Sequence, residues 1–343
     1  MSGKILIIGN FGYANSKIDG QTIKTRNLYC LIKEKHVNPV DYFDTSSKLL
    51  NLSRLIRFFS CFFSSSHIIY LPGQKSLTFL FPYIFILCKI SRKSLTYVVI
   101  GGWLPDFIGD KKFLRFALKK INNILLETPP MKYKMESWYN FKNVRVLPNF
   151  RIHNYSPRIK RELGPLRCVF MSRIVREKGI DVIFRFVEYL IDSGRESLIS
   201  VDFFGPIDNK DKLYFLENIG RFPNLKYNGV LEQQEIHKTL NNYDILLLPT
   251  RYTGEGFPGA ILDAYISGIP VLVSEWNDIS SFVEHNITGF IFELKEEAVF
   301  GEILINLSNQ KDRLNDLKIN AYNKSREYSS EKCWTIIQTC LNN

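Results

Sequence analysis

Two carboxylates flank the start of one predicted helix in the stretch from Asp244 to Ser274. A buried strand is expected before the loop, and Pro258 suits the first turn of the helix because its missing N–H is harmless there. Glu255 lies just outside that helix start, and Asp263 lies further along the helix. The free amides and positive dipole end of a helix N-terminus favour polar or anionic ligand groups. This arrangement suits a hydroxyl-rich ligand, such as a sugar joined to a ribose.

A second segment carries two cations. Residues 172–179, SRIVREKG, follow an expected strand at 166–171 and open an expected helix at 179–193. Fixed cations such as Arg173 and Lys178 can stabilise negative charge on a ligand without needing a metal ion. Alone, the segment is also typical of a solvated basic loop. Together with the two carboxylates, it indicates a site for a ligand that carries both hydroxyls and negative charge.

These segments resemble the large retaining family of two-domain glycosyltransferases that includes sucrose synthase-like and glycogen synthase-like enzymes. This is the GT-B glycosyltransferase family 4, also described as glycosyl transferases group 1. Its hallmark is a Glu that begins Glu-Gly-Phe, then seven residues, then a second Glu. Glu255-Gly256-Phe257-Pro258 matches the first part, whereas the second acid is Asp263, one methylene shorter. The resemblance covers most of residues 1–341 and is strongest over 166–292.

The resemblance implies roles for individual residues. It makes Glu255 a contact of the donor sugar, Asp263 a contact of the ribose, and Arg173 and Lys178 the cations that bind the diphosphate. It further implies donor contacts from backbone positions after Glu255, from a glycine turn before the first helix and from the base-binding end of the second domain: Gly256, Phe257, Pro258, Gly259, Gly20, Gly205, Val230 and Leu231. Many members carry a His near the reacting carbon, where this chain has Gly102 and Trp103. Gly102 could let backbone approach the sugar and Trp103 could stack on it, although a core aromatic is the alternative for Trp103.

The elements that must position these residues alternate between strand and helix patterns, which favours an α/β protein with parallel sheets. In the first half, strands are expected at 5–9, 67–71, 95–100, 123–127 and 144–147, with helices at 22–35 and 76–90. After a linker at 151–166, strands are expected at 166–171, 197–204, 245–249 and 270–274, with helices at 179–193 and 258–267. The resemblance implies the GT-B fold, in which two facing Rossmann-like domains enclose a deep cleft. We expect an acceptor-binding domain at 1–155 with a crossing helix at about 325–343, and a nucleotide-sugar-binding domain at 160–322.

The charge is unevenly distributed. The 343 residues carry a net charge of +11, and residues 1–155 hold 23 Lys and Arg against 8 Asp and Glu, a net of +15. The first half should therefore attract anions, and an expected helix around 111–120 places its cations near one another. We name Lys111, Lys112, Arg115 and Lys119 as membrane-facing candidates, with a solvated helix face as the alternative. No stretch is apolar over the roughly 20 residues that a spanning helix needs. The six cysteines form no metal-ligand spacing, no signal peptide is recognised, and no nucleic-acid module is present.

The sequence therefore predicts a retaining glycosyltransferase at the inner face of the plasma membrane. It would move a hexose-type sugar from a nucleotide diphosphate sugar, with a uridine diphosphate sugar favoured, to a polyprenyl-diphosphate-linked glycan. The product would be a bacterial surface polysaccharide, and no metal or other cofactor is expected. Two alternatives remain open at this stage. One is a nucleotide-sugar epimerase on the same scaffold, and the other is a non-enzymatic protein that binds membranes or nucleic acid through the basic half.

Overall fold

The computed structural model describes residues 3–13, 19–47, 51–159, 164–252, 254–276 and 278–342. Ile18, in the expected glycine turn, and residues 160–163 of the expected linker lie outside the described residues. The chain packs as two compact units. Unit 1 contains Met1–Ile152, Gly254–Pro258 and Tyr328–Asn343, and unit 2 contains His153–Thr253 and Gly259–Glu327.

Unit 1 is built on a parallel sheet of six strands in the order β2-β1-β3-β4-β5-β6. The strands are β1 Ile5–Gly9, β2 Val40–Asp44, β3 His67–Leu71, β4 Ser94–Val98, β5 Asn123–Leu126 and β6 Val144–Val146. The helices are α1 Gly20–Lys35, α2 Leu52–Ser64, α3 Gln74–Phe79, α4 Phe81–Ile90, α5 Leu104–Phe107, α6 Lys112–Lys119, α7 Pro129–Tyr139 and α14 Ser330–Leu341.

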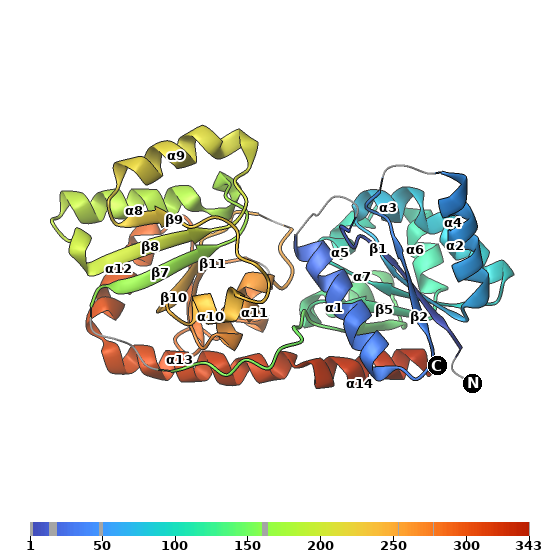
Figure 1. Ribbon diagram of the computed structural model, residues 1–343. Coiled ribbons are helices and arrows are strands. Elements are labelled where there is room, and N and C mark those ends of the chain that lie inside the picture. The colour runs from blue at the N-terminus through green and yellow to red at the C-terminus, as the bar shows by residue number, and fades with distance from the viewer. Residues whose placement is uncertain are drawn as a thin grey trace. The chain divides into compact units, whose positions relative to one another are not determined.

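Alternate side chains of β1 enter two different cores, because successive residues of a strand point to opposite faces. Ile5 and Ile7 pack with residues of α1 and α14, whereas Leu6 and Ile8 pack with residues of α2, α4, α6 and α7. Figure 1 shows α1 on one side of these strands and α2 and α4 on the other. Both faces of the sheet are therefore covered, as an all-parallel sheet requires.

The helix expected at 76–90 is two helices, α3 and α4, which meet at Leu80. Pro82 explains the break, since a proline inside a helix lacks the N–H donor and its ring clashes with the carbonyl four residues earlier. Pro82 instead occupies the first turn of α4, where neither penalty applies.

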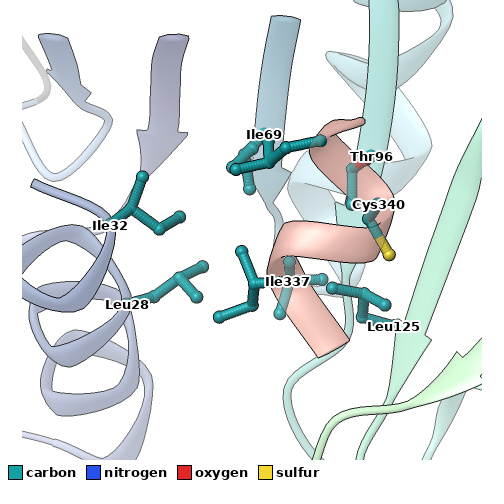
Figure 2. A pocket seen from close by; sticks show the side chains of 9 residues that line it. Leu28, Ile32, Ile69, Thr96, Leu125, Ile337 and Cys340 are labelled. Carbon is teal, nitrogen blue, oxygen red and sulfur yellow. The ribbon is translucent and has the colours of Figure 1, made fainter. Parts of the chain in front are cut away.

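The C-terminal helix α14 packs against the sheet of unit 1. Figure 2 shows Ile337 of α14 facing Leu28 and Ile32 of α1, whereas Cys340 lies on the side of the helix nearer Thr96 and Leu125. The small pocket that these side chains line is apolar apart from Thr96. Because apolar packing fills its walls, the pocket is part of the core that holds α14 in place.

His67 is a buried base in β3. Its Nε2 lies 2.9 Å from Thr96 Oγ1, and burial, with a smaller contribution from His36, lowers the pKa of the His67 imidazole to about 4. The unfolded chain takes up this proton near the ordinary pKa of about 6.5. Unfolded molecules therefore bind more protons between about pH 6.5 and 4, and acid destabilises the fold over that window.

We expect the His67→Gln variant to lose this dependence, because glutamine stays neutral throughout. The free energy of unfolding of the wild type should fall by up to about 3 kcal/mol more than that of the variant between pH 7 and 4. Urea unfolding at several pH values measures the difference. Parallel pH profiles for the two proteins would contradict the assignment.

Unit 2 is also built on a parallel sheet of six strands, in the order β12-β11-β10-β7-β8-β9. The strands are β7 Leu166–Met171, β8 Ile199–Phe204, β9 Leu225–Tyr227, β10 Ile245–Leu248, β11 Val271–Ser274 and β12 Gly289–Phe292. The α-helices are α8 Ile180–Asp192, α9 Lys212–Arg221, α10 Ile236–Leu240, α11 Gly259–Ile266, α12 Glu297–Asn309 and α13 Lys311–Ser325. Short 3₁₀ turns are η1 Arg176–Lys178, η2 Glu196–Leu198, η3 Asn209–Asp211, η4 Ile279–Ser281 and η5 Arg326–Tyr328.

The core of unit 2 joins its strands to amphipathic helices. Ile180, Ile183, Phe184 and Val187 of α8 are buried in one cluster with Phe203 of β8, and Figure 1 shows α8 on one side of the strands and α11 on the other. In neither unit do the described residues include a helix that is both long and apolar enough to cross a bilayer.

Candidate functional site

The loop that carries the two predicted cations in unit 2 is fixed to the end of β8. The Ser172 amide donates to the Phe204 carbonyl at 3.1 Å, and the Ile174 amide donates to the Pro206 carbonyl at 2.9 Å. These bonds continue the pairing of β7 with β8 beyond both strands. The backbone that carries Arg173 is therefore held in place on both sides of that residue.

The same loop is also joined to the segment after β10. The Arg251 amide donates to the Glu177 carbonyl at 2.8 Å, and the Lys178 Nζ lies 4.7 Å from the centre of the Tyr252 ring. Gly179, with φ of +85°, permits this approach, because a Cβ there would overlap the Pro249 carbonyl. Lys178 is thus placed beside the chain segment that leads to Glu255.

Arg173 lies at the solvent-facing side of its loop. Its side chain is 52% exposed, and its Nη1 is 3.9 Å from Asp208 Oδ2. A long, exposed ion pair of this kind contributes roughly 0–1 kcal/mol, so exchanging it for an anionic ligand costs little.

The expected base-binding residues gather at the ends of β8 and β9. Gly205 and Gly229 both adopt positive φ, and the Gly205 amide donates to the Gly229 carbonyl at 2.8 Å. Val230 follows and is 53% exposed, whereas Leu231 is half-buried. Since β9, β8, β7 and β10 are neighbours in one parallel sheet, their carboxyl ends lie along one edge. Ligands of open α/β sheets bind at such an edge.

Asp263, the expected ribose contact, is buried on α11 with a partner that the sequence analysis did not single out. Its Oδ1 lies 3.2 Å from the Nε2 of His237 on α10, and Asp263 is only 4% exposed. The isolated histidine gave no signal in the sequence, because its pairing with Asp263 depends on how α10 packs against α11. His237 therefore belongs with Asp263 in the candidate site.

Unit 1 contains the short segment Gly254–Pro258, which carries Glu255. The Phe257 amide donates to Glu127 Oε2 at 3.1 Å, and the Phe257 carbonyl accepts from Asn149 Nδ2 at 3.3 Å. The Phe257 ring is 2% exposed and packs against Tyr328, with 4.6 Å between ring centres. The Phe257 amide, expected to meet a sugar hydroxyl, is thus bound to Glu127 instead. Pro258 ends the segment, and α11 begins at Gly259.

Glu127 also forms a buried ion pair with Lys24. The Lys24 Nζ lies 2.6 Å from Glu127 Oε1 and 3.0 Å from the Val99 carbonyl oxygen, and the two side chains are only 2% and 4% exposed. The sequence pattern could have indicated that Lys24 is buried. Lys24 lies four and seven residues before Leu28 and Leu31, on the face of α1 that packs against the sheet. A lysine at such a position needs a buried partner. Nothing in the sequence identifies Glu127 as that partner, since it is 103 residues away.

Glycines let the Gly254–Pro258 segment approach the rest of unit 1. A Cβ at Gly102 would overlap the Glu255 carbonyl oxygen, and a Cβ at Gly256 would overlap Glu127 Oε2. The absence of a side chain at Gly102 therefore makes room for the segment that carries Glu255. Trp103 donates its indole N–H to the Ile100 carbonyl at 2.7 Å and packs on the core of the unit, as the alternative interpretation expected.

Gly20 is the first residue of α1 and is exposed, and no atom of the described residues lies within 4 Å of the place where a Cβ would be. None of the described residues would therefore restrict a side chain placed at this position.

The four expected membrane-facing cations divide into two pairs. Lys111 Nζ donates to the Phe107 carbonyl at 2.9 Å, and Arg115 donates to the Ile108 carbonyl at 2.9 Å. Both thereby secure the connection between α5 and α6. Lys112 and Lys119 are exposed. Over the described residues, no group of three or more His, Cys, Asp or Glu side chains is arranged to hold a metal ion.

The chain is similar to known proteins in sequence and in fold. The family Glycosyl transferases group 1 matches residues 153–324. The amylovoran biosynthesis glycosyltransferase AmsK of Erwinia amylovora is 28% identical over 149 residues, which cover 42% of this chain and 36% of AmsK. An Escherichia coli UDP-Gal:alpha-D-GlcNAc-diphosphoundecaprenol alpha-1,3-galactosyltransferase is 33% identical over 92 residues, covering 27% of this chain and 23% of that enzyme. The match thus spans about a third of AmsK and a quarter of the galactosyltransferase.

The structure of Anabaena HepE in complex with UDP and glucose has a TM-score of 0.74 to this chain at 15% identity, covering 99% of this chain and all of HepE. This likeness confirms the expected α/β fold of the GT-B class. Because the family match extends over half of the sequence, the chain belongs to the glycosyl transferases group 1 family.

Proposed function

We propose that this protein is a retaining glycosyltransferase that uses a nucleoside diphosphate sugar as donor. The observation that carries the proposal is the joining of the loops after β7 and β10 in unit 2, where Lys178 lies beside Tyr252 and the Glu177 carbonyl binds the Arg251 amide. The loop with the diphosphate-binding residue types is thereby joined, within unit 2, to the loop that follows β10. Family membership and the glycosyltransferase relatives support the same activity.

In the proposed reaction, the bond between the anomeric carbon and the diphosphate oxygen breaks, and the acceptor hydroxyl oxygen bonds to that carbon on the same face. Arg173 and Lys178 stabilise the charge that develops on the diphosphate, which is the part of the reaction where fixed cations lower the barrier most. The diphosphate takes the acceptor's hydroxyl proton. Glu255 holds hydroxyls of the donor sugar, and Asp263 with His237 serves the ribose.

The substrates are proposed at the level of class. UDP and glucose are named in the HepE complex, which favours a uridine diphosphate hexose as donor. The galactosyltransferase relative is named for an acceptor on diphosphoundecaprenol, which favours a lipid-linked glycan as acceptor. Together with AmsK, these relatives favour a role in bacterial surface polysaccharide synthesis.

A panel of nucleotides and nucleotide sugars tests the proposal by thermal shift, because a ligand that binds only the folded protein raises its unfolding temperature. Uridine diphosphate and a uridine diphosphate hexose should stabilise the protein more than uridine alone, since Arg173 and Lys178 contact the diphosphate. Equal shifts with uridine and its diphosphate would contradict the proposed site. Donor consumption without any acceptor would indicate an epimerase instead.

We expect sugar transfer to be insensitive to chelation. The Arg173 guanidinium and the Lys178 ammonium supply the positive charge that the leaving diphosphate needs, so EDTA should leave the initial rate unchanged within error. The measurement compares rates with and without EDTA after prior dialysis against the chelator. Loss of activity that Mg²⁺ or Mn²⁺ restores would show that the two cations are not sufficient.

A further inference from the structure

The α2 helix of unit 1 has five exposed apolar side chains, Leu52, Leu55, Ile56, Phe59 and Phe63. Of its thirteen residues only Phe62 is buried, although the helix contains seven Leu, Ile and Phe side chains. Leu52, Ile56 and Phe63 are 73%, 62% and 58% exposed. Phe59 stacks on Phe63, with 6.1 Å between ring centres, so the exposed rings form a continuous surface. Single exposed apolar residues are ordinary, whereas a contiguous set marks an interaction surface.

The next helices extend the same surface. Phe62 of α2 and Phe81 and Ile84 of α4 pack into one core, so both helices cover the same face of the sheet. Lys93, just after α4, donates its Nζ to the Phe63 carbonyl at 3.1 Å and links the C-terminal ends of the two helices. The outward apolar residues of this second part are Phe79, Tyr83, Ile86 and Ile90. Together with the exposed side chains of α2, they form what we call the α2–α4 face.

The charge of this region has one sign. Residues 45–105 contain seven Lys and Arg and no Asp or Glu. Lys75 and Arg92 are exposed at the ends of α3 and α4, and α6 adds the exposed Lys112, Phe113 and Phe116. The helices α2, α3 and α4 thus carry cations and no acid beside their exposed apolar side chains. Such a face is complementary to a layer with anionic headgroups and an apolar interior.

We propose that the α2–α4 face binds the surface of an anionic lipid bilayer, with α2 lying in the interfacial region. A helix of thirteen residues is about 20 Å long, too short for the roughly 30 Å hydrocarbon core, so the helix lies along the surface. A second copy of the chain fits less well, because two such faces would bring like charges together. This inference goes beyond the proposed function, since binding to lipid requires neither donor nor acceptor. It also centres the membrane contact on α2, with the exposed Lys112 of α6 beside it, because Lys111 and Arg115 are bound to carbonyls.

Co-sedimentation of the whole protein with vesicles tests the proposal without any sugar substrate. Vesicles of phosphatidylcholine mixed with phosphatidylglycerol should bind the protein at low salt, and vesicles of phosphatidylcholine alone should bind it less. Salt that shortens the Debye length to about 3 Å should weaken binding to the anionic vesicles. The variant Ile56→Ser with Phe63→Ser should bind the anionic vesicles at least about tenfold more weakly than the wild type, because two inserting side chains are lost.

The matched control is Leu213→Ser with Leu216→Ser on α9 of unit 2, where both side chains are also exposed. This control should bind as the wild type does, and both variants should keep the wild-type thermal unfolding temperature. The proposal is overturned if the wild type does not bind anionic vesicles at low salt or if the α2 variant binds unchanged. Self-association that the α2 variant abolishes, without vesicle binding, would assign the face to a second copy and equally overturn it. Because transfer is not measured, failure here leaves the proposed enzyme activity standing.

Discussion

The Lys178→Ala variant is expected to lose sugar transfer by about 10²–10³-fold in kcat while keeping its fold. Removing one fixed group that stabilises charge in the transition state has an effect of this size. The Lys178 side chain is only half-buried, and its contact with the Tyr252 ring contributes roughly 0.5–1 kcal/mol to stability. The unfolding temperature should therefore change little. Initial rates with a saturating uridine diphosphate hexose measure the effect.

Lys210→Ala is the matched control. Lys210 lies on the neighbouring η3 turn of unit 2, is about half exposed, and pairs with Glu177 at 2.9 Å. Its removal takes the same charge from the same region without touching the proposed diphosphate contact, so kcat should stay within about twofold of the wild type. Similar losses in both variants would mean that the overall positive potential, and not Lys178 itself, drives the reaction. A near-normal rate in Lys178→Ala would remove this residue from the site.

Much of the scaffold was predictable because buried strands of a parallel sheet are short apolar runs. The strands β3 and β7 begin and end at the predicted residues, and the cation loop follows β7 as expected. Three strands, β2, β9 and β12, were missed. β9, Leu225–Tyr227, has only three residues, which is too few for an apolar pattern. β2, Val40–Asp44, contains two aspartates and is only half-buried at a sheet edge, so it lacks the apolar signal. β12, Gly289–Phe292, gives little strand signal because its glycine precedes only three apolar residues.

The contacts around the candidate site were less predictable, because they join residues far apart in the sequence. Nothing local shows that Glu127 binds the Phe257 amide 130 residues later, or that His237 meets Asp263. The Glu255 motif predicts amides directed at a ligand, whereas the fold directs one of them to a buried carboxylate. Sequence patterns report burial and local geometry, and long-range polar pairing depends on which helices and loops the sheet brings together.

That pairing leads to the second large expected effect. Glu127→Ala should lower the free energy of unfolding by about 3–5 kcal/mol, because the Lys24 ammonium would remain buried without its carboxylate. It should also impair transfer, because the Phe257 amide loses its acceptor and the segment carrying Glu255 loses an anchor. Urea unfolding and initial rates measure the two effects separately. If neither changes, the ion pair has no role in holding this segment.

A double variant separates stability from positioning. Lys24→Met with Glu127→Leu removes both buried charges and should recover most of the lost stability, since apolar replacements of buried ion pairs are often neutral or stabilising. Transfer should stay impaired at saturating acceptor, with a raised KM for the donor, because leucine cannot accept from the Phe257 amide. Wild-type rates in this variant would make the pair purely structural.

The pair of Lys318 and Asp244 in unit 2 provides the matched comparison. It is equally buried, at 2.9 Å, and Asp244 likewise accepts a backbone amide, that of Arg167 at 3.0 Å. It lies at the start of β10, at the opposite end of that strand from the segment leading to Glu255. Lys318→Met with Asp244→Leu should therefore show a similar stability pattern while transfer stays near normal. Both pairs present the same buried chemistry, so an effect on the donor KM that is confined to the Lys24 and Glu127 variants must come from the contact with Phe257.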